Sequence, residues 1–497
     1  MLRTIFSIGF AQGIGLLVNT ARAKIFAVLL GPAGFGVVAT IDQLILSVSQ
    51  FSNLSLPFTA MKFLSRQHSL GEEQFRRSYA TFLQVITSLS LLATCVAVIL
   101  IPGNLAKFDP QLAKYRQPVF VALLAVPATM LLFFLANVMA ARQKAVQSVL
   151  LTVLSSLVLM LFGAIGCWLG GIVGIYLISV PAFTVLILGI VIFARLKLNW
   201  PLFDQPLALG SKLKGNRAII ETAASAYIAV CSYSAMLLLA RYESISYLSE
   251  EAAGLLQAGL ATSLALGAVL TPTNTLYFAP HVNRAIPATE KIEAVGNFLP
   301  RLIFVFCLGA LPVLLFPELV LRVLFSNRFA PAVAILYWLI LWQYLYQICQ
   351  TYQQLLIGLD DMRACGIINA AGNLAAMALC IWWIHSFGLR GVAGAFLVGA
   401  LIIGLVSVLR LRSKHGLSIL KSIPPIAGLV LLGFLVVGAL GRLTAEMTVF
   451  GIATRLATAI VFLASLWFAL PRSLRNDLST GVISRIRALS SPSTSRT

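Results

Sequence analysis

Apolar runs of about twenty residues recur along the whole chain, and they constrain its fold more than any other feature. A helix of that length spans the hydrocarbon core of a bilayer, and a helix satisfies its own backbone hydrogen bonds there. Only 10% of the 497 residues are charged, whereas soluble domains carry about a quarter. The sequence therefore predicts an all-α polytopic membrane protein. A membrane β-barrel would show shorter segments of alternating hydrophobicity.

The pattern predicts fourteen transmembrane helices in two groups of six plus a final pair. The predicted helices are 6–30, 34–57, 79–101, 118–140, 147–169, 171–194, 219–241, 253–279, 299–324, 331–357, 364–386, 389–410, 423–441 and 448–470. We expect an N-lobe at 1–200, a cytoplasmic linker at 201–216, a C-lobe at 217–413, the final pair within 414–470 and a basic cytoplasmic tail at 471–497.

Basic residues predict the orientation of this layout. Loops on the side of the N-terminus hold about three times as many Lys and Arg as the opposite loops, and such an excess marks the cytoplasmic side. Both termini are therefore expected in the cytoplasm. The net charge of +20 does not indicate nucleic-acid binding, because the cations lie in short loops between apolar runs rather than on a basic domain.

An internal repeat relates the two predicted lobes. The segment Gly171–Tyr176 (GIVGIY) returns as Gly391–Phe396 (GVAGAF), and Ala33-Gly34 returns as Ala253-Gly254, each at a shift of 220. Because six helices separate the copies, both halves keep the same orientation in the membrane. A parallel repeat of this kind places the substrate path at the interface of the halves.

Three cations lie within or at the end of predicted helices. Arg22 and Lys24 lie in the first helix, and Ala240-Arg241 aligns with Ala21-Arg22 at a shift of 219. A charge inside a bilayer is costly and indicates a water-filled pathway or a bound counter-ion. We predict that Arg22, Lys24 and Arg241 bind an anionic headgroup, although the charges do not distinguish phosphate from sulfate or carboxylate. Alternatively, Lys24 extends to the outer headgroups, and Arg241 simply ends its helix in water.

Two stripes of polar residues are candidates for lining a cavity or binding sugar. Gln12 and Asn19 share the stripe of Arg22 on the first helix. The second stripe steps by four, three and four along 331–357 and consists of Gln343, Gln347, Gln350 and Gln354, with Tyr344 beside it. Amides and aromatic rings suit hydroxyl-rich ligands. Hydrogen bonding between helices is an equal alternative for these glutamines.

Acidic residues at membrane depth are few. Asp42 and Glu243 are the candidates for H⁺ or Na⁺ coupling, and the alternative is an ion pair with a neighbouring cation. The sequence has no Walker A or zincin motif and no segment between helices long enough for a catalytic domain. We therefore expect a transporter rather than an enzyme, with no cofactor and no metal.

Three features together resemble a known family. The helices in 6 + 6 + 2 order, the turn Leu29–Gly36 (LLGPAGFG) and the G-x-x-G segments that begin at Gly171 and Gly391 resemble the polysaccharide transporters, the Wzx-type flippases of the multidrug/oligosaccharidyl-lipid/polysaccharide (MOP) superfamily. The resemblance implies a V-shaped bundle with a cationic cavity in the bacterial inner membrane. It also implies alternating-access transport of an undecaprenyl-pyrophosphate-linked oligosaccharide, the repeat unit of O-antigen, exopolysaccharide or capsule.

The resemblance also implies partners, and it leaves two alternative functions open. Expected partners are the lipid-linked oligosaccharide, membrane lipid, a polysaccharide polymerase and a chain-length regulator, with the chain itself working as a monomer. One alternative is a flippase for lipid II, a peptidoglycan precursor, which would also bind its substrate in a cationic cavity. A membrane-embedded glycosyltransferase or ligase is a further alternative, which would need catalytic carboxylates.

Overall fold

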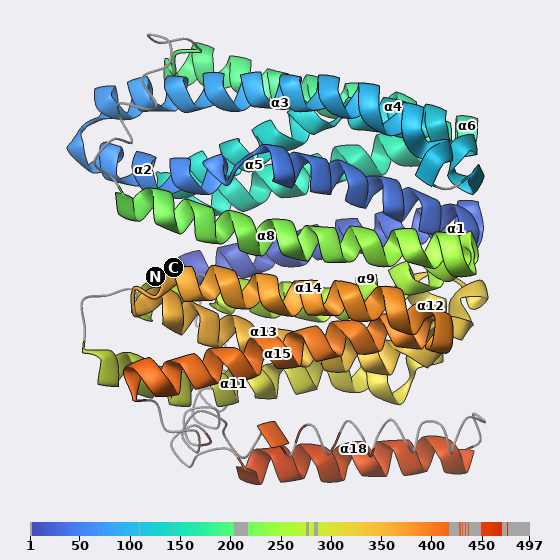
Figure 1. Cartoon of the computed structure of the whole chain (residues 1–497). Coiled ribbons are helices and arrows are strands. Elements are labelled where there is room, and N and C mark those ends of the chain that lie inside the picture. Colours follow the sequence, from blue (N-terminus) through green and yellow to red (C-terminus); the bar gives the residue numbers. More distant parts are fainter. Residues whose placement is uncertain are drawn as a thin grey trace, which may run out of the picture.

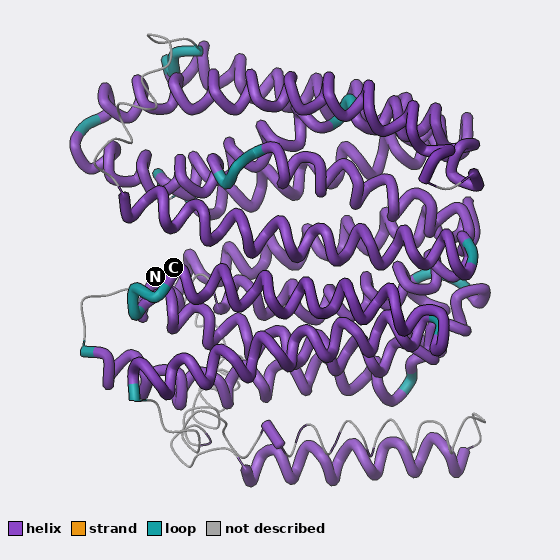
Figure 2. Tube along the Cα trace, viewed as in Figure 1, coloured by secondary structure: helices purple, strands orange, loops and turns teal. Residues whose placement is uncertain are grey.

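The computed structural model describes residues 2–108, 110–142, 144–202, 217–274, 278–282, 287–416 and 449–469, with the single residues 427, 428, 430, 433, 436 and 475. Helices joined by short loops and turns make up the described chain, which contains no strand, as the tube in Figure 2 shows. The predicted linker from residue 203, most of the helix at 423–441 and nearly all of the basic tail lie outside these residues.

The first six predicted spans form the N-lobe. Its elements are α1 (Leu2–Ser52), α2 (Leu56–Leu70), α3 (Glu72–Phe108), the short η1 (Pro110–Tyr115), α4 (Arg116–Leu123), α5 (Val126–Ala141) and α6 (Ala145–Leu198). The helices α1 and α6 each contain two predicted spans. Helix α1 bends at Gly31 (φ 67°), and α6 bends at Gly170 and Gly171 (φ 56° at Gly171). A positive φ, as at Gly31 and Gly171, favours glycine.

The bend at Gly31 divides α1 into two arms. Residues 2–30 are called its first arm, and residues 32–52 its second arm. The end of the bundle at which the arms meet is called the Gly31 end. By the predicted orientation it faces the periplasm.

The N-lobe differs from prediction at two places. The predicted span 118–140 is divided into α4 and α5, which meet at 42°, because Pro127 lies in the first turn of α5 and cannot continue a hydrogen-bond ladder. The helix α2 occupies a segment predicted as loop. Its apolar face holds it in place, since Ala60, Phe63 and Leu64 are buried.

The next six predicted spans form the C-lobe. Its elements are α8 (Arg217–Glu243), the π turn η2 (Ser244–Leu248), α9 (Glu250–Thr273), α10 (Ala279–Val282), α11 (Ala288–Leu315), α12 (Pro317–Leu324), η4 (Asn327–Ala332), α13 (Val333–Gly358), α14 (Met362–Phe387) and α15 (Leu389–His415). The predicted span 299–324 begins earlier and breaks before Pro317. Beyond the C-lobe, α18 (Val449–Ala469) packs along α11.

The two lobes lie side by side with their helices nearly parallel (Figure 1). The N-lobe occupies one side of the bundle and α9 to α15 the other, with α8 between them and α18 along the outside of the C-lobe. Contact between the lobes runs mainly from α1 to α8 and α9. The all-α, two-lobed membrane bundle predicted from the sequence is confirmed.

Repeat-related turns meet where the lobes touch most closely. A Cβ on Gly254 would lie 1.9 Å from the carbonyl oxygen of Pro32, and a Cβ on Gly36 would lie 2.4 Å from the backbone nitrogen of Gly254. Only glycine allows backbones to approach so closely. The turn after Gly31 and the start of α9 are therefore packed backbone against backbone.

The outward-facing side chains of the helices are apolar. Leu17, Ile99, Leu196 and Trp168 are each more than two-thirds exposed, as expected for helices surrounded by lipid. Among the described residues, eight helices are long and apolar enough to cross a membrane, and the bent pair of η1–α4 and α5 makes a ninth. The chain is a multi-pass membrane protein.

Candidate functional site

A cavity of about 300 Å³ lies between the lobes, enclosed by both arms of α1 and by α9. Its polar lining comes from three helix segments that the fold brings together, the two arms of α1 and α9. These side chains are Asn19, Thr20, Arg22, Asp42, Gln257 and Thr262. The cavity thus joins two predicted site residues of the first arm, Asn19 and Arg22, to the predicted acid Asp42.

An ion pair forms the N-lobe side of the cavity. Nη2 of Arg22 lies 2.7 Å from Oδ2 of Asp42, with the side chains 22% and 34% exposed. The hydroxyl of Tyr176 lies 3.0 Å from the other carboxylate oxygen. Nε of Arg22 has no hydrogen-bond partner within the described chain. The pair is thus nearly neutral in charge, and Nε is a buried donor that the described chain leaves unsatisfied.

Arg241 lies deeper, between the lobes, with only 5% of its surface exposed. Its Nε and Nη2 donate to Oε1 of Gln257 at 3.2 and 2.7 Å. Its Nη1 donates to Oε1 of Gln43 at 3.3 Å and to the carbonyl oxygen of Leu237 at 3.1 Å. All these acceptors are neutral amides, and no carboxylate within the described residues forms an ion pair with Arg241. A buried cation without an opposite charge is costly.

The repeat explains why only one of the two arginines has an acidic partner. At the shift of 220, Thr262 occupies the position of Asp42, and Phe396 occupies that of Tyr176. The C-lobe therefore lacks both the carboxylate and the hydroxyl that surround Arg22 in the N-lobe. Asp42, which pairs with Arg22, also attracts Arg241 electrostatically, but Arg241 has no ion-pair partner of its own among the described residues, and the charges of Arg22, Asp42 and Arg241 sum to +1.

Small polar residues hold α8 against the second arm next to Arg241. The hydroxyls of Ser47 and Ser234 are 2.8 Å apart, and Nε2 of Gln43 donates to Ser234 at 3.2 Å. Small side chains let membrane helices approach closely, and their hydroxyls bond across the interface. Through Gln43, Arg241 is in contact with both lobes.

The other predicted ionic residues lie elsewhere. Nζ of Lys24 donates to the carbonyl oxygen of Val323 at 2.8 Å, which ties the first arm to α12. Glu243 is buried and interacts electrostatically with His385 of α14. Neither residue lines the cavity, and Gln12, half-buried on the first arm, does not line it either.

The predicted glutamine stripe of α13 packs against α9, away from the cavity lining. Nε2 of Gln347 donates to the hydroxyl of Thr271 at 3.4 Å, and the amide of Gln343 occupies the space that a Cβ on Gly267 would take. The remaining members are Gln350, which hydrogen-bonds Tyr346, half-buried Gln354, and Tyr344, which donates to the carbonyl oxygen of Ala427 at 3.1 Å.

Sequence reasoning missed Gln257 and Thr262 as cavity residues and Gln43 as the acceptor of Arg241. Gln257 is one polar residue in the otherwise apolar run after Glu251. The alignment of the repeats offered a signal for Thr262, because it stands where the first half has Asp42. No comparable signal existed for Gln43, whose role depends on the packing of α8.

Polar and aromatic contacts join the lobes at the Gly31 end. Nζ of Lys114 lies 2.6 Å from Oε1 of Glu250, and the ring of Phe35 packs 5.8 Å from that of Phe325. Tyr115, next to Lys114 in η1, is hydrogen-bonded to the same glutamate. The lobes are therefore closed against one another at this end.

Comparisons with known proteins relate the fold to solved membrane transporters. No family model and no curated protein matches the chain. The structure of the lipid II flippase MurJ in an inward closed conformation matches with a TM-score of 0.69 at 12% identity, over 94% of this chain and 98% of that one. A MATE structure in complex with MaL6 matches with a TM-score of 0.62 at 14% identity, over 83% and 96% of the two chains.

A third solved structure, a MOP superfamily transporter from Pyrococcus furiosus, matches with a TM-score of 0.61 at 15% identity, over 83% of this chain and 95% of that one. At such identities the likeness establishes the fold. The chain has the fold of MOP superfamily transporters, so the predicted resemblance is confirmed at that level.

Proposed function

We propose that the chain is a flippase, which transfers a lipid-linked oligosaccharide with a pyrophosphate headgroup between bilayer leaflets by alternating access. Arg241 carries the proposal. It is a buried cation between the lobes, its acceptors are neutral amides, and a cavity with a second guanidinium lies beside it. A pyrophosphate would supply the missing negative charge through strong charge-assisted hydrogen bonds.

The hydrogen bonds of Arg241 can couple substrate binding to a movement of one lobe relative to the other. It donates to Gln257 in the C-lobe and to Gln43 in the N-lobe. An anion that draws Arg241 away from Gln43 weakens one bond between the lobes and replaces it with a bond to substrate. A ligand shifts a conformational equilibrium only through such differential contacts.

The conformation described here is compact around the cavity. About 300 Å³ lies at the low end of ordinary ligand sites and does not hold a whole oligosaccharide. Because the lobes are closed against one another at the Gly31 end, the cavity has to widen toward the opposite end of the bundle. By the predicted orientation that end faces the cytoplasm, where a lipid-linked precursor would be loaded.

Coupling to H⁺ or Na⁺ is assigned to Asp42 in this proposal. Its carboxylate bonds Arg22 at the cavity wall, so neutralising it with a proton or a sodium ion would release the guanidinium to the substrate. Glu243, the other candidate, does not line the cavity. The glycan pathway, the inner-membrane location and assembly with a polymerase or chain-length regulator belong to the same proposal.

Leaflet transfer in proteoliposomes tests the proposal. Purified protein is reconstituted with undecaprenyl-pyrophosphate oligosaccharide, and transfer is followed by a glycosidase or lectin that reaches one leaflet. Arg241→Gln is expected to slow transfer by at least tenfold, since a hydrogen bond to a charged group contributes about 1.5 to 3 kcal/mol. The matched control is Arg390→Gln, an exposed arginine outside the cavity. Equal rates for wild type and Arg241→Gln would overturn the assignment.

A lipid II-type flippase is the second candidate, favoured by the MurJ match over 94% of this chain. Lipid II in the same liposomes separates the two, because the substrate that is transferred faster identifies the function. A glycosyltransferase or ligase would instead form a glycosidic bond without leaflet transfer.

A further inference from the structure

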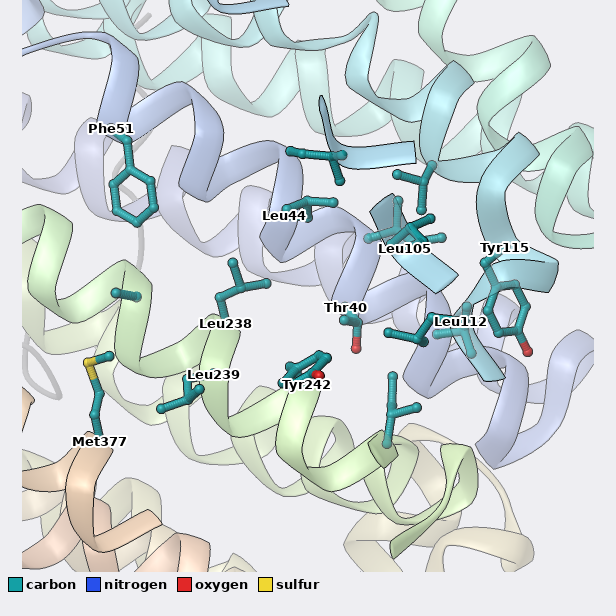
Figure 3. A pocket seen from close by; sticks show the side chains of 16 residues that line it. Thr40, Leu44, Phe51, Leu105, Leu112, Tyr115, Leu238, Leu239, Tyr242 and Met377 are labelled. Carbon is teal, nitrogen blue, oxygen red and sulfur yellow. The ribbon is translucent and has the colours of Figure 1, made fainter. Parts of the chain in front are cut away.

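A second hollow, here called the apolar groove, lies on the other face of the second arm of α1. Its volume is about 460 Å³, and its lining comes from the second arm, the end of α3, η1, α4, α8 with η2, and Met377 of α14. Figure 3 shows the two rows of side chains that face one another across it, from Phe51 at one end to Tyr115 at the other. No charged side chain is among its described lining residues.

The three hydroxyl-bearing side chains of the apolar groove, Thr40, Tyr115 and Tyr242, each interact with other groups of the chain. The hydroxyl of Thr40 donates to the carbonyl oxygen of Gly36 in its own helix, and the hydroxyl of Tyr115 bonds Glu250. The surface left for a ligand is therefore aliphatic and aromatic. Its walls belong to membrane-crossing helices, so hydrocarbon rather than water is the medium that reaches it.

The length of the apolar groove identifies the kind of chain that fits. Along the second arm it reaches from Val37 to Phe51, which is about 21 Å at the rise of an α-helix. One leaflet contributes only about 15 Å of hydrocarbon. A phospholipid acyl chain stays within its leaflet and would leave part of the groove empty. A polyisoprenoid chain is longer than one leaflet and can fill it.

The apolar groove and the cationic cavity share one wall. Val37, Thr40, Ile41 and Leu44 face the groove, while Asp42, between them in sequence, faces the cavity. The groove is also bounded by both lobes, because Leu238 and Tyr242 come from α8 across from the second arm (Figure 3). Whatever fills it therefore contacts the same two lobes that enclose the headgroup site.

From this juxtaposition we infer that the apolar groove binds the polyisoprenoid tail of the transported lipid. The inference rests on the proposed function and extends it, since it assigns the tail to a site separate from the headgroup cavity. Tyr115, bonded to Glu250 across the lobes, closes the groove at the Gly31 end. A tail seated there contacts both lobes at their junction and so favours the closed arrangement.

Photolabelling tests the inference without requiring transport. The full chain in nanodiscs is irradiated with undecaprenyl phosphate that carries a diazirine in its tail, and labelled peptides are mapped by mass spectrometry. We expect labelling of α8 and the start of η2, between Ala235 and Ile245, with competition by unlabelled undecaprenyl phosphate. A phosphatidylcholine probe with the same diazirine in its acyl chain is expected to label this segment weakly, and excess phosphatidylcholine should not compete.

Substitution within the groove supplies the matched variants. Leu238→Trp fills the groove and should reduce labelling by about tenfold, the affinity carried by about two buried methylene groups. Leu161→Trp, at an exposed α6 position outside the groove, should leave labelling unchanged. If Leu238→Trp fails to fold, as judged by gel filtration, Ala235→Leu is the milder filling variant and is held to the same expectation.

Three results would overturn the inference. They are equal labelling by the phosphatidylcholine probe, absence of label between Ala235 and Ile245, and full labelling of a folded groove-filling variant. Failure of the proposed function gives a different result, because photolabelling would persist while leaflet transfer was absent.

Discussion

Replacing Asp42 with asparagine should tighten the binding of a pyrophosphate while slowing transport. The substitution removes the carboxylate that lies 2.7 Å from Arg22 and keeps an amide oxygen for the bond from Tyr176. The cavity then presents the guanidinium of Arg22 without a partner carboxylate, and the second guanidinium, that of Arg241, lies behind Gln257 of the lining. Because the neutral side chain can no longer recapture Arg22, release of the substrate should become slower.

The magnitude follows from the charge that is removed. A carboxylate about 8 Å from a bound unit negative charge contributes about 2 kcal/mol of repulsion at an effective dielectric constant of ~20. About a third of Asp42 is exposed, and solvent screening reduces the value to about 1 kcal/mol. A divalent pyrophosphate doubles the effect, so the dissociation constant should fall by about tenfold to thirtyfold.

Isothermal titration of the purified protein with inorganic pyrophosphate measures this change directly. Glu243→Gln is the matched control, because it neutralises a buried carboxylate that does not line the cavity, and it should change the affinity less than twofold. Unchanged or weaker binding in Asp42→Asn would refute the reasoning. Equal tightening in both variants would show a general charge effect rather than one local to the cavity.

Three further predictions concern the junction of the lobes and the opposite end of the C-lobe. Lys114→Glu and Glu250→Lys should each increase cysteine-probe access at the Gly31 end, and the double variant should restore closure. Gly254→Ala should lower stability by about 1 to 3 kcal/mol, measured as a fall in Tm, because its Cβ would lie 1.9 Å from the carbonyl oxygen of Pro32. For Asp361, burial opposes ionisation, but hydrogen bonds from two cations of α15 prevail and lower its pKa below 3.8. The stabilising effect of this carboxylate is therefore present above pH 3.8 and lost as the pH falls through its folded pKa, so the Tm difference between wild type and Asp361→Asn should shrink under acid; a constant difference would contradict this.

The long elements of the fold could be predicted because hydrophobic runs set the number and order of spans. The turn at Gly31-Pro32 could also be predicted, because glycine followed by proline interrupts a helix. Hydropathy did not reveal α2, because a short helix that buries only one face, including Phe63 and Leu64, has no apolar run. The break between α4 and α5, just before Pro127, was not predicted either, because it depends on how the neighbouring helices pack against a bent span.

The candidate site could be predicted only in part. Arg22 and Asp42 stand out because charges are rare in apolar runs, and the structure places them 2.7 Å apart. Helical periodicity also placed the glutamines of α13 on one face. Periodicity does not say which neighbour that face meets, however, and the structure packs Gln347 against Thr271 of α9. The partner of Arg241, Gln257, depends on the approach of α8 and α9, which no local pattern encodes.

The dependence of leaflet transfer on the charge of the headgroup tests the central claim most directly. Proteoliposomes with the wild-type chain are compared using two lipids that share the same tail and oligosaccharide, one with pyrophosphate between them and one with a neutral linker. A cationic site at Arg22 and Arg241 predicts rapid transfer of the pyrophosphate lipid and transfer of the neutral lipid no faster than in protein-free liposomes. Equal protein-dependent transfer of both lipids would contradict the account.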